Sequence, residues 1–74
     1  MMMTQEEFVN QFAENLRILI RREGITQKEL AKECGMSVNS LRGYISDRPT
    51  VVPSAYTVYK LSVVFGCDAD ELLL

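Results

Sequence analysis

The stretch AKECGMSVNSL, residues 31–41, places a glycine between two segments whose residues both favour helix. Glycine readily adopts the left-handed backbone conformation that closes a helix C-terminus, and a side chain would oppose that conformation. We therefore predict that a short helix over 26–34 ends at Cys34, that Gly35 redirects the chain, and that Ser37 caps a helix over 37–45. Two helices joined so closely must cross at a large angle, which is the geometry of a helix-turn-helix unit.

The residues on either side of Gly35 fit this unit. A small residue is needed where the two helices cross, and Ala31 provides it. Apolar residues are needed to fix the crossing angle, and these are Leu30, Cys34, Met36, Leu41 and Tyr44. The alternative that these residues leave open is a helical hairpin with no role in DNA binding.

Helix starts elsewhere in the chain are marked by capping residues. Thr4 with Glu7, and Thr26 with Glu29, match the capping-box pattern. Ser54 after Pro53 indicates another helix start, and Asp68 is expected to cap a last short helix. We predict five helices, over 4–22, 26–34, 37–45, 54–65 and 68–73. The segment TVV, 50–52, lies between prolines and is expected to be an extended connector rather than a strand.

Each predicted helix carries one apolar stripe at helical spacing, and none would be stable alone. The expected inward-facing residues are Phe8, Phe12, Leu16, Leu19, Ile20, Leu30, Ala31, Cys34, Leu41, Tyr44, Ile45, Val58, Leu61, Phe65, Leu72 and Leu73. The sequence therefore predicts an all-α fold, a compact five-helix bundle that forms a single domain over 1–74.

Composition excludes several classes of protein. No apolar run approaches the roughly 20 residues that span a bilayer, and MMMTQEEF lacks the layout of a signal peptide, so we expect a cytoplasmic chain without membrane contact. The chain has no histidine and no clustered metal ligands, and its two cysteines, Cys34 and Cys67, are interpreted as buried small hydrophobes. No nucleophile–base pair or cofactor motif is present, so we expect no enzyme, no metal and no cofactor.

The charges are distributed unevenly along the chain. The formal net charge is −2, but residues 17–60 hold all eight Lys and Arg residues and only four acidic ones. Both ends of the chain are acidic. A basic middle between acidic ends can present a positive face to a polyanion, although clustering of this size is weak evidence alone.

Two long segments resemble the Cro and phage-repressor-like regulators, also called XRE-type. They are NLRILIRREGITQKELAKECGMSVNSLRGYISDR and PSAYTVYKLSVVFGCDADELL, and the resemblance covers roughly residues 12–73. It implies a lambda-repressor-like domain in which the third helix enters the DNA major groove. The implied function is sequence-specific binding of double-stranded DNA, as a bacterial or phage transcriptional repressor.

Under this resemblance, the outward face of the helix over 37–45 holds the base-reading residues, which we predict to be Val38, Asn39 and Arg42. Asn39 is suited to adenine, Arg42 to guanine or a phosphate, and Val38 to a thymine methyl group. The alternatives are a merely solvated charge for Arg42 and partial burial against Ile45 for Val38.

The phosphate contacts are expected elsewhere. The family places a glutamine at the start of the second helix against the DNA backbone, and Gln27 matches it. The other predicted phosphate-binding residues are Lys28, Ser37, Arg48 and Ser54. Arg17, Arg21 and Arg22 leave two possibilities open, because they either contact phosphates or only solubilise the first helix.

The chain departs from the family pattern in three places. Many members pair a buried arginine with a glutamate where Ile20 and Ile45 stand here, and replacing both partners by apolar groups is energetically consistent. Gly43 takes a position that carries a reading side chain in some members. The segment SDRPTVVPS, 46–54, is longer than the usual connection, and its Val51 and Val52 are expected to be exposed or to make an unspecified contact.

Two functions remain open at this level. One is the DNA-binding regulator, for which tight binding requires two copies on a palindromic site and therefore a possible homodimer, with ELLL, 71–74, as one candidate contact. The other is a protein-interaction module such as an antitoxin, in which DNA contact is secondary. The net acidity of the chain fits the second function slightly better.

Overall fold

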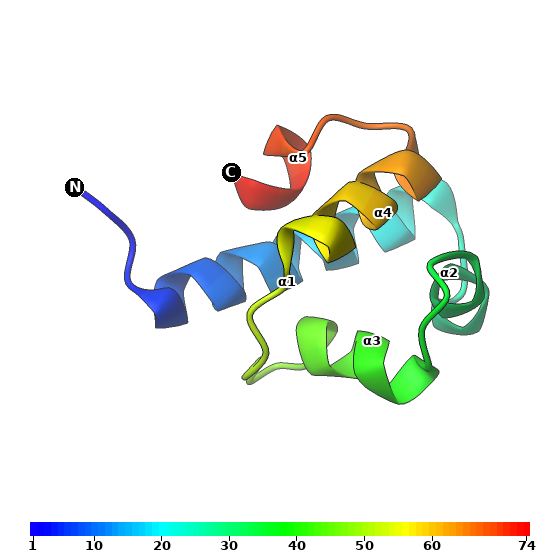
Figure 1. Cartoon of the computed structure of the whole chain (residues 1–74), viewed down its shortest axis with the longest axis horizontal. Helices are drawn as coiled ribbons and strands as arrows, with labels where there is room; N and C mark the ends of the chain where they lie inside the picture. Colours follow the sequence, from blue (N-terminus) through cyan, green and yellow to red (C-terminus); the bar gives the residue numbers. More distant parts are fainter.

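The computed structural model describes all residues 1–74 and contains helices but no strands (Figure 1). The predicted all-α fold is confirmed, and the observed helix bounds lie close to the predicted ones. The five helices are α1 (Gln5–Glu23), α2 (Gln27–Glu33), α3 (Val38–Ile45), α4 (Ala55–Phe65) and α5 (Asp70–Leu73).

Side-chain caps begin the first four helices as predicted. At α1 the Glu7 N–H donates to Thr4 Oγ1 at 3.1 Å, and the Thr4 N–H donates to Glu7 Oε1 at 2.9 Å. Thr26 and Glu29 form the same capping box at α2. Ser37 and Ser54 accept from the third N–H of α3 and α4 respectively. These bonds satisfy N–H groups that a helix start otherwise leaves unpaired.

The prediction that Asp68 caps the last helix is wrong. The residue that precedes α5 is Ala69, in helical conformation, and no side chain caps this helix. Asp68 contributes its backbone carbonyl instead, which accepts from the Glu71 N–H at 3.0 Å. A helix of one turn that follows a helical residue offers no extended N-cap position for an aspartate side chain to use.

The turn at Gly35 closes α2 by backbone hydrogen bonds. Gly35 has a φ of +65°, which L side chains rarely adopt. Its N–H donates to the Lys32 carbonyl at 3.1 Å, and the Met36 N–H donates to the Ala31 carbonyl at 2.9 Å. This pair of bonds is the Schellman closure, and only the four residues from Cys34 to Ser37 lie outside regular helix before α3 begins. The helix over 30–42 is therefore interrupted where predicted.

The core is assembled from all five helices. Its largest fully buried side chains are Phe12, Leu16, Leu30, Leu41, Leu61 and Leu72. Removing one such side chain from water contributes about 1.5–3 kcal/mol, and each helix supplies at least one of them. Every expected inward residue is buried except Phe8, Ile20, Tyr44 and Leu73, which are half-buried, while the buried Val9 and Ala13 of α1 were not predicted.

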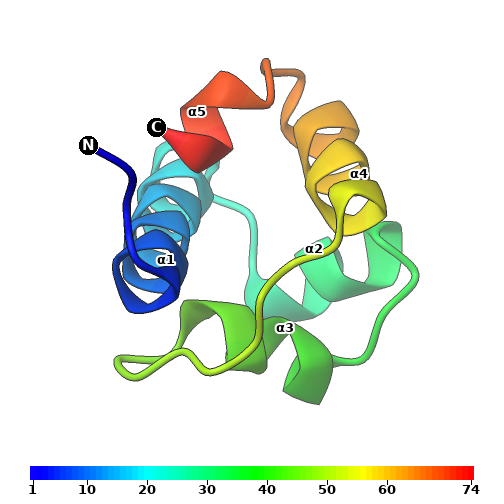
Figure 2. The ribbon, with the colours of Figure 1, turned by 60° about the vertical axis from the view of Figure 1, so that its left-hand side comes forward.

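The long helix α1 organises the bundle. It packs against α3 on one side and α5 on another, while α2 packs against α3. Figure 1 shows α5 above α1, α3 below it and α4 in front of its C-terminal half, and Figure 2 shows the helices arranged around the core. This arrangement puts the inner face of α3 against α1 and leaves its outer face at the molecular surface.

The connector, residues 46–54, contains no strand, as predicted. Pro49 and Pro53 are buried, whereas Val51 and Val52 between them are exposed. Figure 2 shows the connector turning back along α3 before it rises to α4. The two prolines therefore anchor a segment that stays beside α3.

The capping boxes make stability depend on acidity. Hydrogen bonds from the Thr26 hydroxyl and then its backbone N–H lower the pKa of Glu29 below its ordinary value of 4.5, and bonds from the Thr4 backbone and hydroxyl lower the pKa of Glu7 likewise. A lowered folded-state pKa stabilises the fold above the unfolded-state value, and this contribution is lost as the pH falls through the folded-state value.

We therefore expect the urea midpoint to fall as the pH drops below about 4.5. Glu29→Gln should have a shallower acid dependence, because glutamine still accepts at this position but does not titrate. The check is urea unfolding of both proteins between pH 3 and pH 6. Superimposable pH profiles would contradict a role for the Glu29 carboxylate.

Neither cysteine is bonded, and both are at least partly shielded from solvent. Cys34 is buried, as interpreted, and Cys67 is half-buried; neither forms a disulfide. Burial raises the pKa of both thiols, which favours the unreactive protonated form.

None of the five helices combines the length and the apolar character that crossing a bilayer requires.

Candidate nucleic-acid interface

The outer face of α3 carries polar side chains with no partner in the chain. Leu41 and Ile45 are buried on the inner face, whereas Asn39 and Arg42 are exposed. Neither Asn39 nor Arg42 makes a side-chain hydrogen bond, and Arg42 makes no ion pair. Both side chains are therefore available for contacts outside the protein.

Val38 is less available than its two neighbours. It is half-buried and packs against the core cluster, of which Ile45 is one member. Because it opens the first turn of α3, one part of the side chain still reaches the surface.

Gly43 is not an open outward position. It is half-buried, and a Cβ added to it would stand 3.3 Å from Val51 Cγ2. Val51, whose contact the sequence left unspecified, therefore lies over the second turn of α3. The position that carries a reading side chain in some members of the family is thus covered by the connector in this chain.

The predicted phosphate-binding residues lie in two groups. Gln27, Lys28 and Ser37 lie at the starts of α2 and α3, and these helices pack against each other. Arg48 lies on the connector after α3, and Ser54 is the N-cap residue of α4 at the end of that connector. The five residues thus belong to two segments of the chain, one before the body of α3 and one after it.

The serines of the two groups are already engaged through their side chains. Ser37 Oγ accepts from the Ser40 N–H, and Ser54 Oγ accepts from the Thr57 N–H. Each hydroxyl also donates to the side chain of the same partner, at 3.0 Å and 3.1 Å. The backbone N–H groups of Gln27 and Lys28 have no partner in the chain, in keeping with a helix start that favours an anion.

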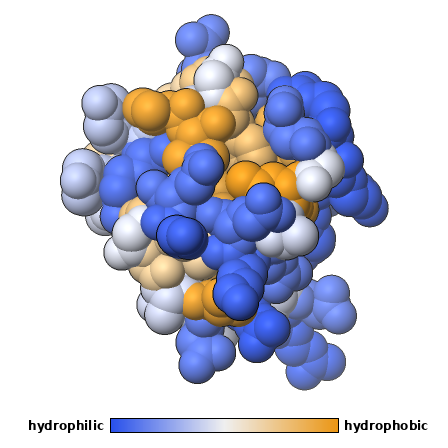
Figure 3. Space-filling model, turned by 90° about the vertical axis from the view of Figure 1, so that its right-hand side faces the viewer, coloured by the Kyte–Doolittle hydropathy of each residue, from blue (hydrophilic) through white to orange (hydrophobic).

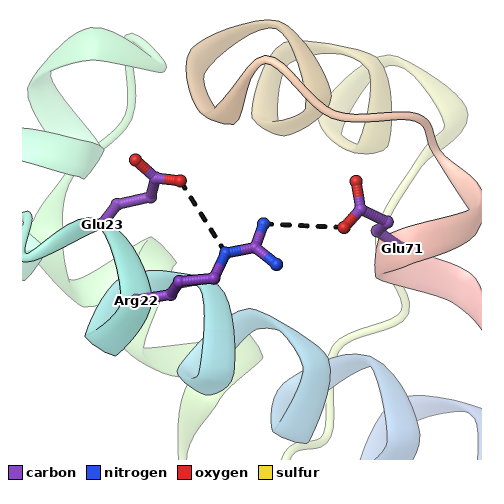
Figure 4. A network of polar contacts seen from close by, with 3 residues as sticks. All are labelled: Arg22, Glu23 and Glu71. Atoms are coloured by element: carbon purple, nitrogen blue, oxygen red, sulfur yellow. Dashed lines mark ion pairs between the residues drawn. The ribbon is translucent and has the colours of Figure 1, made fainter.

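Some of the basic side chains have interaction partners within the chain, and others have none. Arg22 is paired with Glu23 at 3.9 Å and with Glu71 of α5 at 3.5 Å (Figure 4). Lys60 lies over the Tyr56 ring, 4.8 Å from its centroid. The exposed basic side chains without an ion pair or hydrogen bond are Arg21, Lys28, Lys32, Arg42 and Arg48. The free positive charge is thus concentrated on α2, α3 and the adjoining segments.

The end of the molecule at which α2 lies is mainly hydrophilic. Figure 3 shows this surface as mostly polar, with an apolar area across its upper half and a smaller one near the bottom. Such a surface suits contact with a polar, charged partner better than burial against another apolar face.

No group of three or more His, Cys, Asp or Glu residues in the chain is placed to hold a metal ion. A family model described as helix-turn-helix matches residues 16–72, which is most of the chain. The chain belongs to the Cro/C1-type helix-turn-helix family. A search of curated proteins gives no match.

Family membership fixes the roles of the helices in general terms. Proteins of this helix-turn-helix family are DNA-binding regulators, and this chain is one at that level of description. Its helix-turn-helix consists of α2, the turn at Gly35 and α3. The side-chain assignments on α3 go beyond the family match.

Arg17 has a role in this helix-turn-helix domain that the sequence left open. From α1, its Nη1 donates to the Ile45 carbonyl at 2.8 Å and to the Ser46 carbonyl at 3.2 Å. These carbonyls belong to the C-terminal end of α3, which carries partial negative charge. Arg17 therefore holds the end of α3 against α1, and it does more than solubilise α1. Ile45 is buried and Ile20 packs against the core cluster, so neither position holds an ion pair.

Removing the Arg17 donors should loosen the end of α3. We expect Arg17→Met to destabilise the fold by about 1–2 kcal/mol, because it leaves the partly buried Ile45 carbonyl without its charged donor. The Ser46 amide should exchange with solvent faster, and Arg17→Lys should recover part of the loss. Arg21→Met is the matched control and should leave stability unchanged. Equal stability of the Arg17 and Arg21 variants would contradict the role.

Two contacts of this domain were missed from sequence, namely Arg17 with the end of α3 and Val51 with Gly43. The only sequence signal for the second was a glycine at an outward helical position followed by valines between two prolines. No signal in the sequence pointed to the first, because it depends on how α1 crosses α3.

Proposed function

We propose that residues 1–74 form a single domain that recognises a specific sequence of double-stranded DNA through the outer face of α3, as a bacterial or phage transcriptional repressor in the cytoplasm. The observation that carries the proposal is the combination of the family match with the free, exposed side chains of Asn39 and Arg42 on that face. These are the side-chain types that pair bidentately with adenine and guanine in the major groove.

The remaining contacts divide by function. Val38 contributes an apolar contact to a thymine methyl from its exposed part. Gln27, Lys28 and Ser37 contact phosphates on one side of α3, and Arg48 and Ser54 contact phosphates on the other. Ser37 and Ser54 act through backbone groups near the helix start, because their hydroxyls already serve as caps.

A second copy is part of the proposal. One domain of this size covers a few base pairs and carries few free positive charges, so tight binding requires two half-sites about 34 Å apart. Leu72 is a core residue and is excluded from the contact between copies, while Leu74 is exposed. A mass measurement in solution, with and without the selected duplex, tests the stoichiometry.

The function is tested by selecting duplexes that bind the protein from a random pool. The protein is then titrated with the most enriched duplex and with a scrambled duplex at several salt concentrations. A DNA reader loses affinity steeply as salt rises and keeps its preference for the selected sequence. No enrichment of any sequence, with equally weak binding at low salt, would overturn the proposal.

One observation favours a second function, the protein-interaction module such as an antitoxin. An apolar groove of about 430 Å³ lies between α1, α4 and α5, and its lining includes Phe8, Tyr59 and Leu73. It is separate from the outer face of α3. Indifference to DNA, together with binding of a protein partner that Tyr59→Ala abolishes, would favour this function over DNA recognition.

A further inference from the structure

Val51 adds an apolar group to the outer face of α3. Position 43 has no side chain because the residue is glycine. A Cβ atom added there would lie 3.3 Å from Val51 Cγ2, so the Val51 side chain lies directly beside this position. Val51 nevertheless remains 44% exposed. It therefore stands over Gly43 with part of its side chain facing outward.

The position of Gly43 relates Val51 to the proposed reading residues. Asn39 and Gly43 are four residues apart, so they lie on the same helix face about one turn, or 5.4 Å, from each other. Val51 therefore continues the surface that begins with Asn39. Bases stack about 3.4 Å apart along a strand. A base contacted by Val51 would therefore lie one or two base pairs from the base that Asn39 contacts.

The connector holds Val51 in place before any partner binds. Pro49 and Pro53 are buried two residues before and two residues after Val51, so both ends of this short segment are anchored on the fold, and the rings also restrict the backbone of Arg48 and Val52. A β-branched side chain such as valine also has few rotamers. An apolar contact made by such a residue loses little conformational freedom on binding.

We propose that Val51 is a base-reading residue, supplied by the connector in place of a side chain at position 43, and that it contacts the C5-methyl group of a thymine. The inference rests on the proposed function, since it assumes that α3 lies in the major groove. The thymine lies one or two base pairs from the base that Asn39 reads. The methyl group is the only apolar feature that a base presents in that groove.

The test replaces each thymine of the selected half-site by deoxyuridine, one at a time, which removes only the C5-methyl group. Affinities are measured for the parent and for Val51→Ala, Val51→Thr and Val52→Ala. Val52 is the matched control, because it is 45% exposed on the same connector but does not lie over Gly43. Thermal unfolding of each variant separates binding effects from loss of fold.

We expect one thymine at which deoxyuridine weakens binding by the parent about three- to tenfold, the scale of one buried methyl group. Val51→Ala should bind the thymine duplex more weakly and become insensitive to deoxyuridine at that position. Val51→Thr, which keeps the branched shape, should retain part of the sensitivity. Val52→Ala should behave as the parent, and a second sensitive thymine that Val51→Ala leaves unchanged belongs to Val38.

The inference is overturned if the parent binds its selected duplex specifically but the deoxyuridine profile of Val51→Ala is the same as that of the parent. It is also overturned if Val51→Ala and Val52→Ala weaken binding equally at every position, which would indicate a general effect of the connector. Failure of the proposed function looks different, because the parent itself then shows no preferred duplex.

Discussion

Arg42→Ala should relax sequence preference at one base pair of the site while leaving the fold intact. Arg42 is exposed on the outer face of α3 and has no partner in the chain, so its removal leaves no unpaired group behind. A bidentate arginine–guanine contact provides about 1–3 kcal/mol of discrimination against the wrong base, or roughly 5- to 150-fold. The measurement is the ratio of affinities for the selected duplex and duplexes changed at single positions.

Gln27→Ala provides the contrasting control. Gln27 opens α2 and is proposed to contact a phosphate, which carries no sequence information. We expect this variant to bind every duplex more weakly and by a similar factor, with its ranking of sequences unchanged. If both variants bind all duplexes as the parent does, α3 has been assigned the wrong role. If Arg42→Ala lowers all affinities equally, Arg42 contacts a phosphate.

Leu41→Ala should destabilise the fold more than any substitution on the outer face of α3. Leu41 is fully buried, so its loss removes apolar contacts and leaves a cavity, at a cost of about 2–5 kcal/mol. A domain of this length has a total stability of roughly 4–11 kcal/mol. Urea unfolding monitored by circular dichroism should therefore show a large fall in the midpoint, with DNA binding lost as the fold is lost.

The neighbouring residue makes this prediction specific. Leu41 and Arg42 are adjacent in sequence, but Leu41 is buried and Arg42 is exposed, so Arg42→Ala should change stability by less than about 0.5 kcal/mol. Substitution of Leu41 should thus lower stability, whereas substitution of Arg42, the next residue, should change sequence preference. A small effect of Leu41→Ala, or a large loss of stability in Arg42→Ala, would mean that α3 is turned the other way.

Local signals in the sequence predicted most of the fold, because they act over a few residues. The capping boxes at Thr4 and Thr26 and the glycine turn at Gly35 depend on neighbours three to five positions away. The apolar stripes predicted which faces turn inward for the same reason. Asp68 shows the limit of such signals, since a matching residue type did not ensure the backbone conformation that capping requires.

The contacts that sequence did not predict join elements far apart in the chain. The bond from Arg17 to the Ile45 carbonyl spans 28 residues, and it exists only once α1 has crossed the end of α3. The contact of Val51 with Gly43 requires the path of the connector, which Pro49 and Pro53 determine by being buried. The outward position of Asn39 and Arg42 followed from helical period alone, whereas the covering of Gly43 did not.

The central claim is that DNA is bound by the outer face of the helix that follows Gly35. The most direct measurement is an NMR titration of the labelled protein with its selected duplex, followed by observation of protein–DNA proximity. We predict that the largest shifts occur at Val38, Asn39 and Arg42, and that side-chain protons of α3 lie close to base protons in the major groove. Shifts confined to the apolar groove between α1, α4 and α5, with α3 unchanged, would contradict this assignment.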